Sequence, residues 1–230
     1  MNDYLKDFVV ENPTLIKDQV YDKIKKEILS GSISPGSRVL EGRLAKQVNV
    51  SRTPVREALH VLEKEGFLES FPRVGYRVRQ ITWMEAIEIN EIRAVLEPLA
   101  VKKAIESEDQ SYVGELEEVL KKKEKAARQN QINPFLQYDA EFDEIIAQAS
   151  GMKTLVDVWA TLRHRLKLYR MGAQDSSETM MRSIKGHWKI LECLKSKDKE
   201  GVTRAIIEHL EDSKQDIRRI RFRTGQNRSA

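Results

Sequence analysis

The amino-acid sequence predicts a mostly α-helical protein in two parts: an N-terminal winged helix-turn-helix, then an all-helical antiparallel bundle. Two observations lead to this prediction. Short elements of mixed type fill the chain up to about residue 81, and from there long amphipathic runs follow one another without a strand pattern. We therefore place one domain at residues 1–81, a second at 82–222 and a basic, flexible tail at 223–230.

Three short helices are expected in the first domain. In Gln19–Ser30 the apolar residues recur every four positions, which is the spacing of one helix face, and a Gly- and Pro-containing segment then ends the run. Leu40–Val48 forms a second helix, with Leu40 expected on its inward face. A third helix follows Val50 and runs to about Glu65.

After the third helix the pattern changes to period two. In LESFPRVGYRVRQI, Tyr76 and Val78 alternate with Arg77 and Arg79 around a turn that contains Pro and Gly, which predicts a β-hairpin. A helix, a helix–turn–helix and a hairpin, in this order, are the parts of a winged helix.

The remainder, from Trp83, is expected to form an antiparallel bundle of about 140 residues. Its helices should be separated where polar residues, Gly and Pro gather. These breaks fall near Ser107–Ser111, Asn130–Pro134, Ser150–Lys153, Gly172–Ser177 and Lys195–Gly201.

The composition narrows the class of protein. In 230 residues, 33% are charged and 40% hydrophobic, which suits a globular protein, and the net charge of +4 favours an anionic partner only weakly. The single cysteine, Cys193, excludes an internal disulfide framework and a multi-cysteine metal cluster. No apolar run approaches the roughly 20 residues that cross a bilayer, and no secretory signal opens the chain. We expect a cytoplasmic protein without a membrane partner.

The third helix begins with signals that suit a phosphate contact. Thr53 followed by Pro54 fits an N-cap with proline in the first turn, and Ser51 is the alternative cap. With either cap, free backbone N–H groups lie beside hydroxyl groups at the helix start. Such a terminus favours a phosphate group.

Two arginines on this helix suit base recognition. Arg52 and Arg56 lie one turn apart on one face, and the apolar residues of the helix lie on another. An arginine can bind guanine O6 and N7 with two hydrogen bonds in the major groove. The basic residues near this helix are Arg38, Arg43, Lys46, Arg52 and Arg56, with Arg73, Arg77 and Arg79 on the hairpin. A solvated basic face is the alternative, but the complete helix–turn–helix with its basic hairpin favours DNA.

The segment PGSRVLEGRLAKQVNVSRTPVREALHVLEKEGFLES resembles the winged-helix signature of the GntR family of bacterial transcription regulators. The helical remainder resembles the FCD ligand-binding domain of the family's FadR branch. The resemblance covers the chain from about Leu15 to about Phe222, and SRTPVREAL is a specific motif. It implies DNA contacts by Arg52, Thr53 and Arg56 in the recognition helix, by Ser51 on phosphate, and by Gly75 at the wing tip.

One position departs from the family pattern. The family often has an arginine directly after the glutamate of the second helix, whereas this chain has Gly42 there and Arg43 next. We keep Arg43 as a candidate DNA contact, together with Arg73 on the hairpin.

Polar side chains recur among apolar ones in the helical part. Asp139 and Asp143 lie one turn apart on an apolar stripe, and His187 and His209 each lie between apolar residues in later helices. Burying such groups unpaired is costly, and two adjacent carboxylates repel each other unless a cation shares the site.

Two carboxylates and two imidazoles form a workable ligand set for a divalent metal. The pattern alone nevertheless favours the alternative, in which each histidine is a satisfied core residue and the acids face water. The resemblance favours the metal. Metal-binding FCD domains use a D-x-x-x-H pair and two later histidines. Asp139, His187 and His209 fall on these positions, and Asp143 stands where the first histidine would be. The resemblance thus implies a divalent transition metal: Zn, Ni, Mn or Fe.

An effector site is also implied. Arg93 matches the R-x-x-L-E start of the FCD domain, and Arg163 or Arg165 is placed to reach the same cavity. An i,i+4 ion pair with Glu97 is the simpler explanation of Arg93. The resemblance implies that a small organic acid binds beside the metal.

The leading prediction is a ligand-responsive transcriptional regulator, by family frequency a repressor, that binds a pseudo-palindromic double-stranded DNA operator as a homodimer. A metal-dependent enzyme built on the Asp/Asp/His/His cluster is one alternative. The sequence has no G-x-G-x-x-G, P-loop or H-E-x-x-H motif, and the cluster leaves no obvious general base, so we expect no enzyme activity. An architectural DNA binder is the other alternative, but it would need no buried polar cluster.

Overall fold

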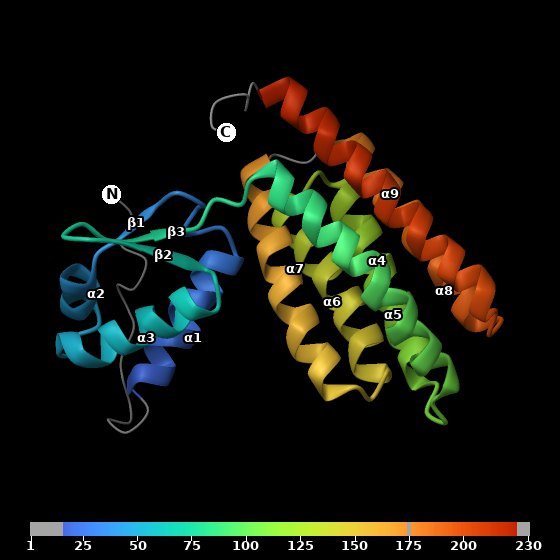
Figure 1. Cartoon of the computed structure of the whole chain (residues 1–230), viewed down its shortest axis with the longest axis horizontal. Coiled ribbons are helices and arrows are strands. Elements are labelled where there is room, and N and C mark those ends of the chain that lie inside the picture. The colour runs from blue at the N-terminus through green and yellow to red at the C-terminus, as the bar shows by residue number, and fades with distance from the viewer. Residues whose placement is uncertain (1–15, 174–175, 225–230) are drawn as a thin grey trace. The chain divides into compact units, whose positions relative to one another are not determined.

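A computed structural model describes residues 16–173 and 176–224 of the chain. The chain divides into two compact units, residues 1–80 and 81–230, which are described separately (Figure 1). Most of the expected tail at 223–230 lies outside the described residues. Its first two positions belong to the last helix, which ends at Thr224.

The first unit is a winged helix, as the sequence predicts. Its sheet is antiparallel in the order β1-β3-β2. The hairpin consists of β2 and β3, and the short strand β1, which precedes the helix–turn–helix, pairs with the other edge of β3. The elements are α1 (Ile16–Leu29), β1 (Arg38–Val39), α2 (Glu41–Gln47), α3 (Arg52–Lys64), β2 (Leu68–Phe71) and β3 (Gly75–Val78).

The core of this unit comes from α1 and α3. The stripe at positions 20, 24 and 28 of α1 is fully buried, and so is the apolar face of α3. One prediction is wrong: Leu40 is 45% exposed. Leu40 is the N-cap of α2 and has an extended backbone. Its side chain therefore does not point along the face that the helical residues after it bury. Leu44 and Val48 are buried as expected.

The wing depends on a glycine. Gly75 has a φ of +103°, and a Cβ at this position would lie 3.2 Å from the carbonyl oxygen of Val39. Glycine therefore allows β3 to lie close to β1 at the point where the hairpin turn ends. Arg73, in the turn itself, has a φ of +64° and is exposed.

The second unit is a helical bundle, and no strand occurs within its described residues, 81–173 and 176–224. The breaks between helices fall where the sequence predicts them. Helix α4 packs against α9, α5 against α6, and α8 against α9. The helices are α4 (Trp83–Glu106), α5 (Ser111–Arg128), α6 (Ile132–Ala149), α7 (Lys153–Ala173), α8 (Ser177–Lys195) and α9 (Lys199–Thr224).

Helix α4 is well defined at its start and interrupted further along. The Thr82 hydroxyl accepts a hydrogen bond from the Glu85 backbone N–H at 3.2 Å, and the Glu85 carboxylate accepts one from the Thr82 N–H at 3.0 Å. Pro98 lies inside the helix and has no N–H to donate to the carbonyl of Ala94. None of the described helices is both long and apolar enough to cross a membrane.

Candidate functional sites

The start of α3 presents free polar groups. Of the two possible N-caps, the structure selects Ser51, and the helix begins at Arg52 with Thr53 in its first turn. The Ser51 hydroxyl accepts no hydrogen bond from the backbone of α3, and all three residues are exposed. Backbone N–H groups and two hydroxyl groups are therefore available to a phosphate at this helix end.

Arg56 is held by an acid of the preceding helix. Its Nε and Nη2 donate hydrogen bonds of 2.9 Å to the two carboxylate oxygens of Glu41, and the Arg56 side chain remains 66% exposed. These hydrogen bonds lower the pKa of Glu41. Since a guanidinium carries five N–H donors, the end opposite the Glu41 contact stays available for a guanine edge.

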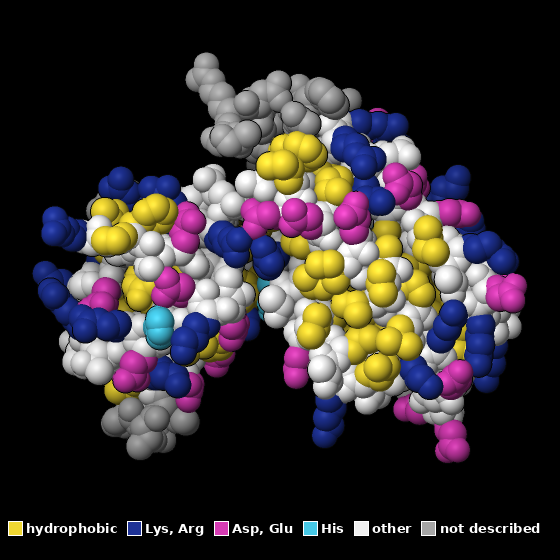
Figure 2. Space-filling view, in the orientation of Figure 1, with side chains coloured by type: hydrophobic (Ala, Val, Ile, Leu, Met, Phe, Trp, Pro, Cys, Tyr) yellow, Lys and Arg dark blue, Asp and Glu magenta, His cyan; other side chains and the backbone are white. Residues whose placement is uncertain are grey.

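Arg52 lies over Gly42, the position at which the sequence departs from the family pattern. A Cβ on Gly42 would lie 3.4 Å from the Arg52 Nη2, so the guanidinium lies within van der Waals distance of this position. Arg43 is half-buried in α2. Figure 2 shows many Lys and Arg side chains around α2 and the hairpin of the first unit, which is the charge that a DNA backbone attracts.

The structure brings together the four residues predicted to bind a metal. Asp139 and Asp143 come from α6, His187 from α8 and His209 from α9. Both imidazoles are buried, and their ring centroids lie 4.5 Å apart. A Cβ on Gly186 would lie only 2.5 Å from Nδ1 of His209, so glycine at this position is needed for α9 to approach α8.

Each carboxylate of this group already has a cationic partner. Asp143 accepts a hydrogen bond from Arg93 Nη2 at 2.9 Å, and Arg93 also pairs with Glu97 one turn along α4. Asp139 pairs with Arg170 Nη1 at 2.6 Å and with Lys123 Nζ at 2.5 Å. Arg93 therefore makes both the i,i+4 pair and a contact within the site.

The electrostatics of the cluster follow from burial and these pairs. Burial alone would raise the pKa of Asp139, but the charges of Lys123 and Arg170 hold it well below its usual range. Burial, together with the Lys123 charge, lowers the pKa of both histidines, to about 3 for His209. The two imidazoles are thus neutral at neutral pH. The pKa of Glu97 rises to about 7 because burial outweighs the attraction of Arg93.

These residues do not fit a divalent metal. Cations already lie beside three of the four predicted ligands: Asp139 contacts Lys123 and Arg170, Asp143 contacts Arg93, and Nδ1 of His187 contacts Lys123. Across residues 16–173 and 176–224, no group of three His, Cys, Asp or Glu side chains is arranged to hold an ion.

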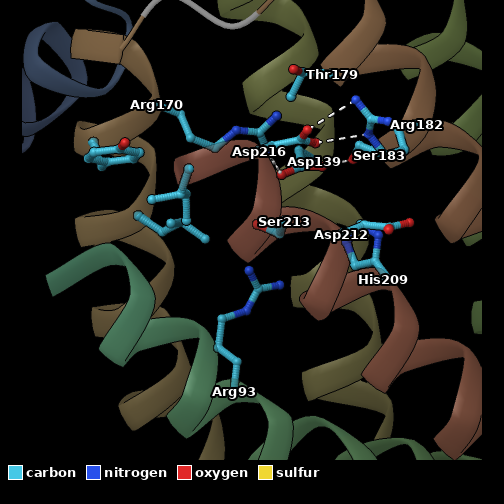
Figure 3. Close-up of a pocket in the computed structure, with 13 residues that line it drawn as sticks. Arg93, Asp139, Arg170, Thr179, Arg182, Ser183, His209, Asp212, Ser213 and Asp216 are labelled. Atoms are coloured by element: carbon cyan, nitrogen blue, oxygen red, sulfur yellow. Dashed lines mark hydrogen bonds and ion pairs between the residues drawn. The ribbon is translucent and has the colours of Figure 1, made fainter. Parts of the chain in front are cut away.

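A cavity open to solvent adjoins the cluster. It contains about 520 Å³ of empty space, including its mouth, and Figure 3 shows Arg93, Arg170 and Arg182 around it, with Arg182 bonded to Asp216. The lining residues are Arg93, Asp139, Leu166, Tyr169, Arg170, Thr179, Arg182, Ser183, His209, Asp212, Ser213, Asp216 and Ile217.

A second, smaller cavity shares part of this lining. Arg163 and Lys167 of α7 lie along it with Arg93, Arg170 and the two aspartates of α6. Of the three predicted effector residues, Arg93 and Arg163 therefore reach a cavity. Arg165 lines neither; it pairs with Glu85 of α4 at 2.9 Å.

Sequence reasoning missed several residues of this site, and for some of them a signal was present. Lys123 falls on the stripe of α5 that also carries Leu116 and Leu120, seven and three positions before it. Ser183 lies one turn before His187, and Asp216 lies two turns after His209, so both share a buried face with a predicted ligand. Arg170 and Arg182 carry no such signal, because long side chains reach the cavity from the edge of their helices.

The first unit is a winged helix whose α3 exposes arginines, and the second is a helical bundle with a charged cavity. Together they define the class: a DNA-binding protein with a ligand-binding domain. Comparison with known proteins gives the same class. Residues 16–78 match the bacterial regulatory proteins of the gntR family, and residues 88–212 match the FCD domain. The chain belongs to the GntR family and carries an FCD domain, as its sequence motifs indicate.

Named relatives support this assignment over nearly the whole chain. The chain is 30% identical to the HTH-type transcriptional regulator YdhC of Bacillus subtilis (strain 168) over 220 residues, covering 94% of this chain and 97% of the relative. It is 26% identical to the HTH-type transcriptional repressor RspR of Escherichia coli (strain K12), covering 91% and 92%. The solved structure of E. coli McbR/YncC matches with a TM-score of 0.76 at 28% identity, covering 91% of this chain and 98% of that one.

The protein is therefore a ligand-responsive, DNA-binding transcriptional regulator. Because the family consists of regulators, the prediction that the chain is not an enzyme is confirmed.

Proposed function

We propose that the protein is a homodimeric repressor that binds a pseudo-palindromic operator and responds to a small organic acid bound in the cavity beside α4. The observation that carries the proposal is the cavity itself. Arginines from three helices line it (Arg93, Arg170 and Arg182), together with the neutral imidazole of His209. A guanidinium binds a carboxylate with two parallel hydrogen bonds, so an organic acid is the ligand class that this lining recognises.

Lys167 supports an anionic ligand independently. It is partly buried at the second cavity, and within the described part of the chain it has no ion pair. Burial lowers its pKa, which is the effect of a charge removed from water without a bound counter-ion. A carboxylate that reaches this second cavity, which shares Arg93 and Arg170 with the first, would supply the missing partner.

The dimer is supported by an exposed apolar stripe on α4. Ile92, Val95 and Leu99 lie on one face of the helix, and Val95 is 74% exposed. Val158 of the neighbouring helix α7 is exposed as well, and Figure 2 shows hydrophobic side chains gathered on one face of the helical unit. Large exposed apolar patches mark interaction surfaces, and a second copy burying the same stripe accounts for this one.

Replacing Val95 by glutamate is expected to yield a monomer, since a self-complementary interface would then place two carboxylates opposite each other. Sedimentation equilibrium measures the mass of the wild type and the variant. Met181→Glu is the matched control, because Met181 is an exposed apolar residue on α8, outside the stripe, and should leave the dimer intact. A dimeric Val95→Glu variant would rule out this interface.

The response is tested with operator DNA selected from a random duplex pool. The dissociation constant is measured by fluorescence anisotropy, with and without gluconate, citrate, lactate and short acyl acids. We expect one chemical class to raise the melting temperature of the protein and to weaken operator binding. Lys167→Met should lose this response, whereas Arg165→Met, which changes a residue outside both cavities, should keep it. An acid that stabilises the protein without changing operator affinity would count against the proposal.

A further inference from the structure

Lys123 is an unusual residue for the middle of a helical bundle. Its side chain is 0% exposed, and its ammonium lies 4.9 Å from the centre of the Phe135 ring. A lysine is almost never fully buried without partners that compensate for the loss of water. The surrounding groups must therefore stabilise the charge.

Three acceptors surround the ammonium. The Lys123 Nζ lies 2.5 Å from Oδ1 of Asp139, 2.7 Å from Nδ1 of His187 and 3.0 Å from Oγ of Ser183. An ammonium has three N–H donors, and three acceptors surround it. Two of the acceptors belong to the residues that match the metal ligands of the family. The lysine thus lies among the atoms that would otherwise surround a metal ion.

The same contacts determine the state of His187. An ammonium only donates hydrogen bonds, so Nδ1 of His187 accepts and the proton of the neutral ring lies on Nε2. A neutral imidazole has one ring-nitrogen lone pair, and Lys123 uses it. His187 cannot ligate a metal through that nitrogen while the lysine is in place.

The two predicted carboxylate ligands are engaged as well. Oδ2 of Asp139 pairs with Arg170, and Oδ2 of Asp143 pairs with Arg93. Asp143 also replaces the histidine that the family pattern has at this position, so the site carries an additional carboxylate. The Lys123 charge acts on this carboxylate too, since burial raises the pKa of Asp143 and the charge of Lys123 lowers it.

We propose that the ammonium of Lys123 takes the place of the divalent ion, so that this FCD domain carries a covalently tethered cation and binds no metal. It follows, resting on the proposed function, that the arginines and Lys167 hold the organic acid without a metal ion. A simple carboxylate then suffices, and the acid needs no second oxygen to chelate an ion.

Metal analysis of untagged protein tests the first part without any effector or operator. The protein is purified without chelators, exposed to Zn²⁺, Ni²⁺ and Mn²⁺ in turn, and desalted. We expect far less than one ion per chain, and a melting temperature that neither the metals nor EDTA changes. Close to one ion per chain, lost with EDTA together with thermal stability, would overturn the proposal whatever the outcome of the operator experiments.

A double variant tests whether the lysine is the cause. Lys123→Ala with Asp143→His removes the tethered ammonium and provides the Asp/His/His/His set, which should bind about one Zn²⁺ or Ni²⁺ per chain and melt at a higher temperature with the metal than without. Asp143→His alone is the matched control and should bind none, because Lys123 still engages Asp139 and His187. If the double variant also binds no metal, or if Asp143→His alone binds it, Lys123 does not replace the ion. If the alanine variant fails to fold, Lys123→Met, which keeps most of the length of the side chain, replaces it. The double variant Lys123→Met with Asp143→His should also bind about one Zn²⁺ or Ni²⁺ per chain.

Discussion

Replacing Arg52 or Arg56 by alanine is expected to weaken binding to the selected operator by about 10-fold to 100-fold and to relax the preference for its bases. Both guanidinium groups lie at the exposed start of α3, where a winged helix meets the major groove. Glu41 holds Arg56 by its Nε edge, so the arginine is already oriented before DNA arrives. Fluorescence anisotropy at one fixed salt concentration, on the operator and on single-base variants, measures both effects.

Arg128→Ala is the matched control for this experiment. Arg128 is an exposed arginine of the helical unit, paired with Glu124 at 2.6 Å, and its loss should leave operator binding unchanged. Glu41→Ala should weaken binding less than Arg56→Ala, since it removes the orientation and not the contact. Wild-type affinity in both arginine variants would show that α3 does not read bases through these side chains.

Replacing Arg93 by methionine is expected to lower the free energy of unfolding by about 3–5 kcal/mol, because it leaves two buried carboxylates without their cation. Asp143 and Glu97 are both buried, and Arg93 contacts each of them. Methionine keeps most of the volume, so the loss reports the charge. Urea unfolding followed by circular dichroism measures it. Lys103→Met, which breaks a solvent-exposed pair with Glu106 on the same helix, should change stability little.

The deficit of this variant should depend on pH in a defined direction. The pKa of Glu97 in the folded wild type is about 7, above its value in an unfolded chain, so this group lowers stability as the pH rises between the two values. Without Arg93 the pKa values of Glu97 and Asp143 rise further. At pH 5 the folded variant can keep both carboxyl groups protonated and neutral at little cost. At pH 8 it must either bury two unpaired carboxylates or hold protons that the unfolded chain releases, and both cost free energy. The deficit is therefore larger at pH 8, and an equal deficit at both pH values would show that lost packing dominates.

Much of the fold follows from local patterns. Each helix of the bundle has an apolar stripe and a polar or Gly-containing break, and the second hairpin strand alternates apolar residues with arginines after a Pro- and Gly-containing turn, so both parts were predictable. Strand β1 was not, because two residues contain no period; it exists only because β3 pairs with it. Leu40 was placed inward for a related reason: helical periodicity does not apply to a cap with an extended backbone.

The site was predictable only in its acids and histidines. Those residues interrupt apolar stripes of α6, α8 and α9, and the structure brings them together. Lys123 also interrupts a stripe, but it stands in a run of lysines that suggests a solvated face. Whether a lysine is buried beside a cluster of acceptors depends on the tertiary structure, since the acceptors come from helices far away in sequence. The metal stays a prediction. In the proposal made above, the ammonium of Lys123 balances the buried carboxylates in place of a metal ion.

The proline in α4 has a mechanical consequence. An α-helix transmits bending and rotation along its axis as a stiff rod, and it yields most easily where a hydrogen bond of its ladder is missing. In α4 that point is the carbonyl of Ala94, next to Arg93, whereas the segment from Trp83 to Arg93 contains no proline or glycine. This segment is about 15 Å long and starts directly after its Thr82 cap. We therefore expect a tilt imposed on Arg93 to reach the first turn of α4 without attenuation, while the far half of the helix stays in its packing with α9.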